Sequence, residues 1–191
     1  YAANMQRLQS LAARTGQAVL LYNGQPAAAC YHAISSGHTE ASQNVWGGQL
    51  PYLCGVDSAW DKFADGYEVT IQYSAEQVRT ALEELGLTPN DSPESWVGAS
   101  TWDKAGYVRT LELCGQMVSG LEVRKALDLR STCFAIAWRG GQFVITTRGY
   151  GHGVGLSQYG AKAMAEGGAG WEDILGVLFS GNGNCKLGVR K

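Results

Sequence analysis

Residues 148–161 read RGYGHGVGLSQYGA and connect a stretch typical of a β-strand to one typical of an α-helix. Glycine occupies every second position from Gly149 to Gly155, so one face of this loop carries no side chains. A ligand or another strand can therefore approach the backbone closely, and Tyr150 and His152 are expected to project together from the other face. No Gly-Lys-Ser/Thr follows and no βαβ unit surrounds the loop, which argues against a phosphate- or dinucleotide-binding turn.

The sequence around this loop predicts one α+β domain over residues 1–191, with mainly antiparallel β-hairpins and several short helices. Turn dipeptides such as Asn23-Gly24 separate runs of alternating polarity, and Ser-x-x-Gln and Ser-x-x-Glu capping boxes open two helices. The expected strands are 18–22, 25–31, 67–73, 107–113, 116–118, 133–138 and 142–147. The expected helices are 4–14 with Gly16 as its C-cap, 75–85, 120–127, 157–166 and 171–179.

Charge and hydropathy exclude two classes of partner. The 191 residues carry 15 Lys and Arg against 17 Asp and Glu, a formal net charge of -2 with no block of like charges. Nucleic-acid binding needs a basic surface, so we expect no nucleic-acid partner. The longest uncharged apolar stretch, 174–179, is far shorter than the ~20 residues of a membrane span. We therefore expect no membrane span in this chain.

The cysteines form no recognisable framework, because five are present and none belongs to a C-x-x-C pair. Most are expected to be small, buried hydrophobic residues. One cluster could hold a metal: Cys30 and His32 share a face of a strand, and His38 follows six residues later. Three ligands do not complete a structural zinc site, so the spacing alone predicts no required cofactor.

A second polar segment, 31–60, gathers histidine, serine, glutamate and tryptophan where a hydrophobic core would exclude them. With six tryptophans and nine tyrosines in the chain, this composition suits a groove that stacks sugar rings and binds their hydroxyl groups. The expected substrate-binding residues are His32, Ser35, Ser36, Gly37, Thr39, Trp46, Tyr150, Gly151, Gly153, Gln158 and Tyr159.

Other interpretations of these residues stay open. Trp46 and Trp60 could each be core residues, and His152 could be a buried histidine bonded to the backbone, although its flanking glycines favour a site. A Ser-His-Asp hydrolase can be assembled from Ser35 or Ser36 with His152 and Asp57. The sequence has no Gly-x-Ser-x-Gly elbow to support it.

The two segments resemble the stage II sporulation protein D family. Four stretches are similar to the first half of the family: HAISSGHTE at 32–40, VWGG at 45–48, LPYL at 50–53 and WD at 60–61. Two are similar to its second half: LRSTCF at 129–134 and the run at 149–161. The resemblance implies a lytic transglycosylase that cuts peptidoglycan glycan strands without stem peptides and leaves 1,6-anhydro-muramic ends. It also implies an extracytoplasmic location, at the cell wall or the outer face of the membrane. The related amidase enhancers imply an alternative, a non-catalytic glycan-binding module that acts with an N-acetylmuramoyl-L-alanine amidase.

The implied chemistry needs one glutamic acid that protonates the bridging oxygen, after which the 6-hydroxyl of the same sugar attacks C1. Such an acid stays protonated only in a partly desolvated cleft. In the family this glutamate lies on an upstream helix, whereas the first helix here, which ends LAARTG, contains no acidic residue. We therefore expect Tyr1 to begin a fragment that lacks the acid and the family's Cys/His segment, with zinc possible in the full-length protein. The alternative acid is Glu40, and His152 is the second catalytic candidate.

Overall fold

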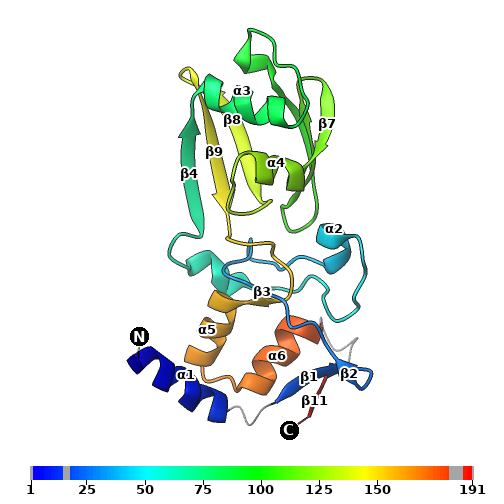
Figure 1. Cartoon of the computed structure of the whole chain (residues 1–191), viewed down its shortest axis with the longest axis vertical. Helices are drawn as coiled ribbons and strands as arrows, with labels where there is room; N and C mark the ends of the chain where they lie inside the picture. The colour runs from blue at the N-terminus through cyan, green and yellow to red at the C-terminus, as the bar shows by residue number, and fades with distance from the viewer. Residues whose placement is uncertain (1, 15–17, 181–186, 191) are drawn as a thin grey trace.

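The glycine-rich loop lies at the middle of an elongated molecule, between an upper and a lower group of elements (Figure 1). The computed structural model describes residues 2–14, 18–180 and 187–190. The helices are α1 (Ala2–Arg14), α2 (Ser42–Trp46), η1 (Ala59–Phe63), α3 (Ala75–Glu84), η2 (Pro93–Ser95), α4 (Gly120–Ala126), α5 (Gln158–Glu166) and α6 (Trp171–Ser180), with η marking 3-10 helices. The strands are β1 (Val19–Tyr22), β2 (Gln25–Pro26), β3 (Tyr31–His32), β4 (Glu68–Tyr73), β5 (Val97–Trp102), β6 (Val108–Leu113), β7 (Gln116–Ser119), β8 (Phe134–Arg139), β9 (Gln142–Arg148), β10 (Leu156–Ser157) and β11 (Leu187–Arg190).

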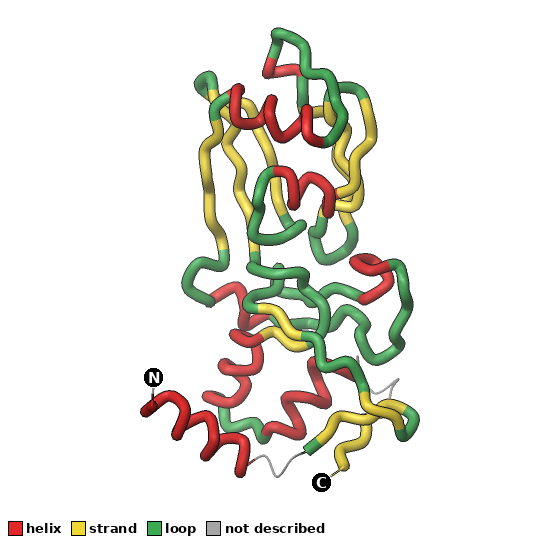
Figure 2. The backbone as a smooth tube through the Cα atoms, viewed as in Figure 1, coloured by secondary structure: helices red, strands yellow, loops and turns green. Residues whose placement is uncertain are grey.

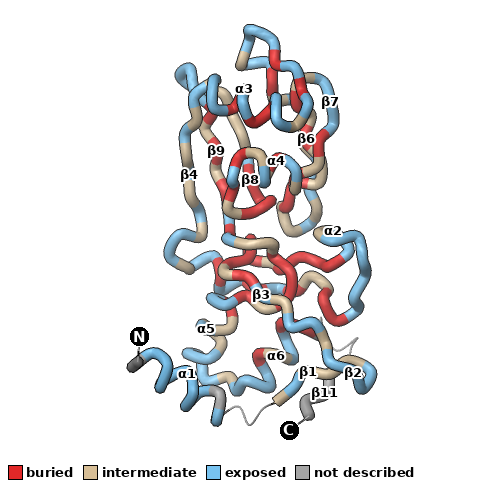
Figure 3. Tube along the Cα trace, viewed as in Figure 1, coloured by how far each residue is buried: buried red, intermediate tan, exposed pale blue. Residues whose placement is uncertain are grey.

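The upper lobe consists of two antiparallel sheets, β4-β9-β8 and β5-β6-β7, together with α3 and α4 (Figure 2). Both sheets and both helices contribute side chains to one hydrophobic cluster, in which Trp96, Val123 and Phe143 are at most 1% exposed. Figure 3 shows this buried material between the sheets, with exposed residues outside. The capping boxes predicted for α3 and α4 are both formed, and the predicted α+β class is confirmed.

The predicted hairpin turns at 23–24 and 114–115 are confirmed, and both central residues of each turn have positive φ. Asn23 and Gly24 have φ of 51° and 78°, and Cys114 and Gly115 have 50° and 79°. Both central residues of a type I′ turn need this conformation. The predicted strand 25–31 is wrong in extent, because β2 ends at Pro26 and the chain forms β3 only where β10 offers a parallel partner.

The lower lobe packs α5 and α6 beneath the middle of the molecule, beside the sheet β11-β1-β2. Its buried residues form two smaller clusters, one around Leu53 and Phe179 and the other around Val56 and Leu178. The helix predicted at 4–14 is confirmed as α1, while its proposed cap Gly16 lies outside the described residues. No helix in the described part of the chain is long and apolar enough to cross a membrane.

Between the lobes, the loops of residues 31–58 and 149–157 run side by side, and we call this region the waist. Besides the β3–β10 pair, isolated bridges join Ile34 to Tyr150 and Glu40 to Val154. Other parts of the protein fill the glycine face of the loop: a Cβ on Gly155, where φ is +75°, would lie 2.3 Å from the carbonyl oxygen of Cys30. The alternating glycines therefore serve close packing of the two loops.

Candidate functional site

Three aromatic rings meet at the waist, and we call Trp46, His152 and His32 the aromatic trio. The ring centroids of Trp46 and His152 lie 5.1 Å apart, and those of His152 and His32 lie 5.9 Å apart. His32 is 4% exposed, whereas Trp46 at the end of α2 is 51% exposed. The core interpretation of Trp46 is therefore wrong, because half of its surface is exposed; its ring contacts His152, which in turn contacts the buried His32.

Both imidazoles of the trio are held in the neutral form at neutral pH. Burial lowers the pKa of His32 to about 4, with the nearby His152 acting in the same direction and a hydrogen bond to the Val154 carbonyl opposing it. Burial, followed by the positive charge of Arg124, also lowers the pKa of His152. Among the described residues, Nε2 of His32 has no hydrogen-bond partner. The trio is therefore uncharged, and that nitrogen of His32 is buried within it.

Glu40 lies beside the trio but its carboxylate is fully engaged within the protein. Oε1 accepts hydrogen bonds from the Ala41 amide and from Asn44, both at 2.8 Å, and Oε2 pairs with Arg109 at 2.7 Å. Arg109 also pairs with Asp103. Burial raises the pKa of Glu40, and the three donors act in the opposite direction. At 3% exposure, this side chain offers no free carboxyl to a substrate.

The polar run at 35–39 is used to hold its own loop. Ser35 and Thr39 are each 1% exposed. The Ser35 hydroxyl accepts a hydrogen bond from the Gly37 amide, and the Thr39 hydroxyl accepts one from the Val56 amide. The Ser36 hydroxyl donates to the carbonyl groups of Ala105 and His38. These hydroxyls are committed to hydrogen bonds within the fold and assemble no Ser-His-Asp triad.

Asp61, in η1, joins the two loops of the waist and was not among the residues predicted for the site. It is 0% exposed; Oδ2 accepts from the Ser35 amide at 2.8 Å and Oδ1 from the Ser157 hydroxyl at 2.7 Å. Ser157 is the N-cap of α5, where its hydroxyl accepts from the Gly160 amide. Asp61 thus ties the first loop to the second. Its only sequence signal is its place in the WD pair at 60–61, which carries no periodicity.

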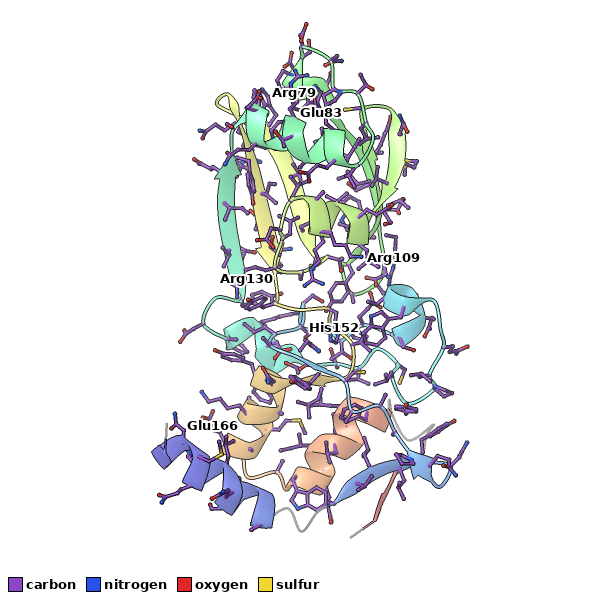
Figure 4. The ribbon with its side chains drawn as sticks, viewed as in Figure 1. Arg79, Glu83, Arg109, Arg130, His152 and Glu166 are labelled. Atoms are coloured by element: carbon purple, nitrogen blue, oxygen red, sulfur yellow. The ribbon has the colours of Figure 1, made fainter. Side chains whose placement is uncertain are left out.

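The remaining predicted residues separate into different places. Tyr150 is half exposed, and the guanidinium of Arg130 lies 4.4 Å from its ring centroid. Tyr150 therefore pairs with Arg130, a residue that was not predicted, whereas His152 belongs to the trio. Figure 4 shows Arg130 and Arg109 on opposite sides of the molecule, above His152. Tyr159 lines a hollow of about 200 Å³ with Trp60, which is itself 59% exposed. The core interpretation of Trp60 is therefore wrong too.

Three further predicted positions have mainly backbone roles or lie at the surface. Gly151 has φ of +118° and a Cβ there would lie 2.8 Å from the Cβ of His32. Gly153 has φ of +80° and lies against the Tyr107 hydroxyl. Gln158 is exposed as the first residue of α5. The trio is therefore the part of the predicted site that the structure assembles.

The proposed metal ligands do not come together in the part of the chain that the structure describes, where no three His, Cys, Asp or Glu side chains could hold an ion. Nδ1 of His38 is hydrogen-bonded to the Thr39 carbonyl at 2.8 Å. Cys30, Cys114 and Cys133 are free thiols. The expectation that most cysteines are buried is wrong for the four that the structure describes, because only Cys133 is buried. Cys185 lies outside the described residues.

Comparison with known proteins places this geometry in context. No family model matches the chain. It is 35% identical to stage II sporulation protein D of Bacillus subtilis (strain 168) over 182 residues, which are 95% of this chain and 52% of that protein. It is 36% identical to stage II sporulation protein D of Bacillus amyloliquefaciens over equal shares. The amidase enhancer of Bacillus subtilis is more distant, at 26% identity over 216 residues, 85% of this chain and 30% of that protein.

The chain spans about half the length of the two curated sporulation proteins. The match includes most of the waist and both lobes, since it extends over 95% of the chain. The resemblance indicated by the motifs at 32–40 and 149–161 is thereby confirmed: along nearly all of its length, the chain is related to stage II sporulation protein D.

Proposed function

We propose that this chain forms the glycan-binding part of a peptidoglycan lytic transglycosylase that acts on strands without stem peptides. The aromatic trio is the observation that carries the proposal. Its exposed Trp46 ring suits the apolar C–H face of a pyranose ring, and the neutral His152 imidazole beside it allows that face to pack without burying a charge. The proposed place of action is extracytoplasmic, at the cell wall.

The position of Trp46 supports a binding role because its backbone is fixed. The residue ends α2, and Gly47 closes the helix in the left-handed conformation with φ of 77° while its amide donates to the Gln43 carbonyl. The ring rests on His152, whose own loop is packed against residues 30–35. A ring held in place loses little conformational entropy when a sugar stacks on it.

The catalytic acid of this reaction is proposed to come from residues outside the 191. Glu40 is paired with Arg109, and both carboxylate oxygens of Asp61 accept hydrogen bonds within the waist. Either group would have to leave its partners before it could protonate a glycosidic oxygen. The curated relatives are about twice as long as the match, which leaves room for an acid elsewhere in a longer protein.

The test measures binding of the chain to denuded glycan strands. We expect Trp46→Ala to weaken this binding about fivefold to tenfold, because a stacked ring contributes about 1 kcal/mol or more. Trp60→Ala removes another exposed indole and should leave the affinity unchanged. Equal effects of the two substitutions, or no binding by the unmodified chain, would refute the proposal. Anhydro-muramic ends formed by the chain alone would place the acid within it and return the role to Glu40.

The second candidate is a non-catalytic module that stimulates an N-acetylmuramoyl-L-alanine amidase, and the similarity to an amidase enhancer favours it. The two functions differ in what the chain must recognise. A substrate-binding part of a transglycosylase should prefer denuded strands, whereas a stimulating module should raise the release of stem peptides by a purified amidase. Stimulation without any preference for denuded strands would favour the second candidate.

A further inference from the structure

A second cavity, of about 840 Å³, lies outside the aromatic trio. It is bounded by the lower ends of β8 and β9, the start of β4, the turn between β5 and β6, and η1. Its lining residues are Ser36, Lys62, Tyr67, Glu68, Trp102, Ala105, Gly106, Cys133, Phe134, Ala135, Thr146 and Arg148. A monosaccharide unit with its substituents fits such a volume, since ligand sites of ~300–1,000 Å³ hold drug-sized molecules.

The walls of this cavity are fastened to each other by hydrogen bonds. The Tyr107 hydroxyl, just after the β5–β6 turn, donates to the His38 carbonyl at 3.0 Å and accepts from the Ser36 amide at 3.1 Å. The Ser36 hydroxyl donates to the Ala105 carbonyl at 2.8 Å, and the Tyr67 hydroxyl donates to the Ser36 carbonyl at 2.8 Å. The cavity is therefore preformed by contacts between the upper lobe and the waist.

An aromatic face and an uncompensated cation line this cavity. Trp102 is 57% exposed at the end of β5. Arg148 and Glu68 neutralise each other through a 2.7 Å ion pair. The Lys62 side chain lies against Gly37, where an added Cβ would be 2.3 Å from Cε. Within the described ranges, its ammonium group is in no salt bridge. The lining thus carries a net positive charge beside an indole.

We propose that this cavity binds an N-acetylmuramic acid unit through its free lactyl carboxylate, with Lys62 as the cationic partner and Trp102 as the stacking surface. This inference rests on the proposed function and adds the basis of its specificity. In a strand that bears stem peptides the lactyl carboxyl is an uncharged amide. Hydrolysis of that amide leaves a carboxylate on the sugar, so a cation at this place distinguishes denuded strands from intact ones.

The experiment compares three ligands: denuded glycan oligosaccharides, the same oligosaccharides with stem peptides, and neutral oligomers of N-acetylglucosamine. Lys62→Gln should weaken binding of the denuded ligand about fivefold, since the ion pair is partly exposed, and should leave the neutral oligomer unaffected. The loss should shrink as salt is added. Lys104→Gln is the matched control, because Lys104 is an exposed lysine on the neighbouring turn that does not line the cavity. Trp102→Ala should weaken binding of both the denuded oligosaccharides and the neutral oligomers.

The outcomes separate this inference from the proposed function. If the chain binds denuded and neutral glycans but Lys62→Gln behaves like Lys104→Gln, the inference is wrong and the proposed function stands. An equal loss for denuded and peptide-bearing ligands would also overturn it, because the cation would then be reading some other acidic group. If the chain binds none of the three ligands, both proposals fail. Thermal unfolding of each variant shows whether a loss of affinity reflects a loss of fold.

Discussion

Replacement of Asp61 by alanine tests whether this buried carboxylate holds the two loops of the waist together. The substitution removes the acceptor of the Ser35 amide, which stays buried because Ser35 is 1% exposed. An unsatisfied buried donor of this kind costs about 1–3 kcal/mol. The Ser157 hydroxyl loses its 2.7 Å bond as well, but it can keep the Ala33 carbonyl at 3.4 Å, so its loss is smaller.

The two losses together lower the free energy of unfolding by about 2–3 kcal/mol. For a chain of this size each kcal/mol corresponds to about 2–4 °C, so Asp61→Ala should lower Tm by about 5–10 °C. Asp61→Asn should cost about 1 kcal/mol, because its amide oxygen can still accept from Ser35 while Ser157 turns to Ala33. Thermal unfolding followed by circular dichroism measures both, with the exposed Asp65→Ala as control.

Two results would refute this reasoning. A fall in Tm of less than about 2 °C for Asp61→Ala would mean that water or a loop shift satisfies the Ser35 amide. An equally large fall for Asp61→Asn would mean that the negative charge, not the hydrogen-bond acceptor, is what the waist requires. In either case Asp61 would not be the tie that the geometry describes.

Two further predictions concern the same region. Gly155→Ala should lower the free energy of unfolding in urea far more than Gly24→Ala. Both positions have positive φ, which costs an alanine about 1 kcal/mol, but only at Gly155 would the new Cβ meet the Cys30 carbonyl, at 2.3 Å. Equal effects of the two substitutions would contradict the packing role of the loop. The folded-state pKa of His32, about 4, lies below the ordinary 6.5, so its contribution to stability is complete above pH 6.5 and is lost as the pH falls toward 4, by up to about 3 kcal/mol. Urea unfolding across that range should show a smaller loss in His32→Gln, and parallel profiles would show that His32 is not responsible.

The sequence predicts the local elements well because their signals are local chemistry. The Asn23-Gly24 turn and the capping box at Ser74 involve residues one to three positions apart, and both have the expected geometry. Strand β5 was missed because its sequence, VGASTW, has weak strand propensity; β6 holds it in place through an irregular register. The β3–β10 pair joins residues 31–32 to 156–157, and no local pattern encodes such a partnership.

In the candidate site too, local sequence signals could be predicted and long-range contacts could not. Trp46 and His152 could be chosen from their polar and glycine-rich surroundings, and the structure brings them together. The serine and threonine residues of 35–39 carried the same polar signal, yet their hydroxyls are satisfied inside the waist. A polar run therefore indicates that polar groups are gathered, but only the tertiary contacts decide whether they face a ligand or each other.

Glu40 shows what this distinction means for mechanism. Residue type and a polar setting make it a reasonable acid, and burial raises its pKa as an acid would need. Its partner Arg109 lies 69 residues away on the other lobe and also contacts the Asn44 carbonyl. An acid that must release a proton and take it back needs room for substrate at its oxygens. Both Glu40 oxygens are occupied, Oε1 by Ala41 and Asn44 of the same segment and Oε2 by Arg109 of the upper lobe. Glu40 is thus better explained as a clamp that sets the distance between the aromatic trio and the upper lobe.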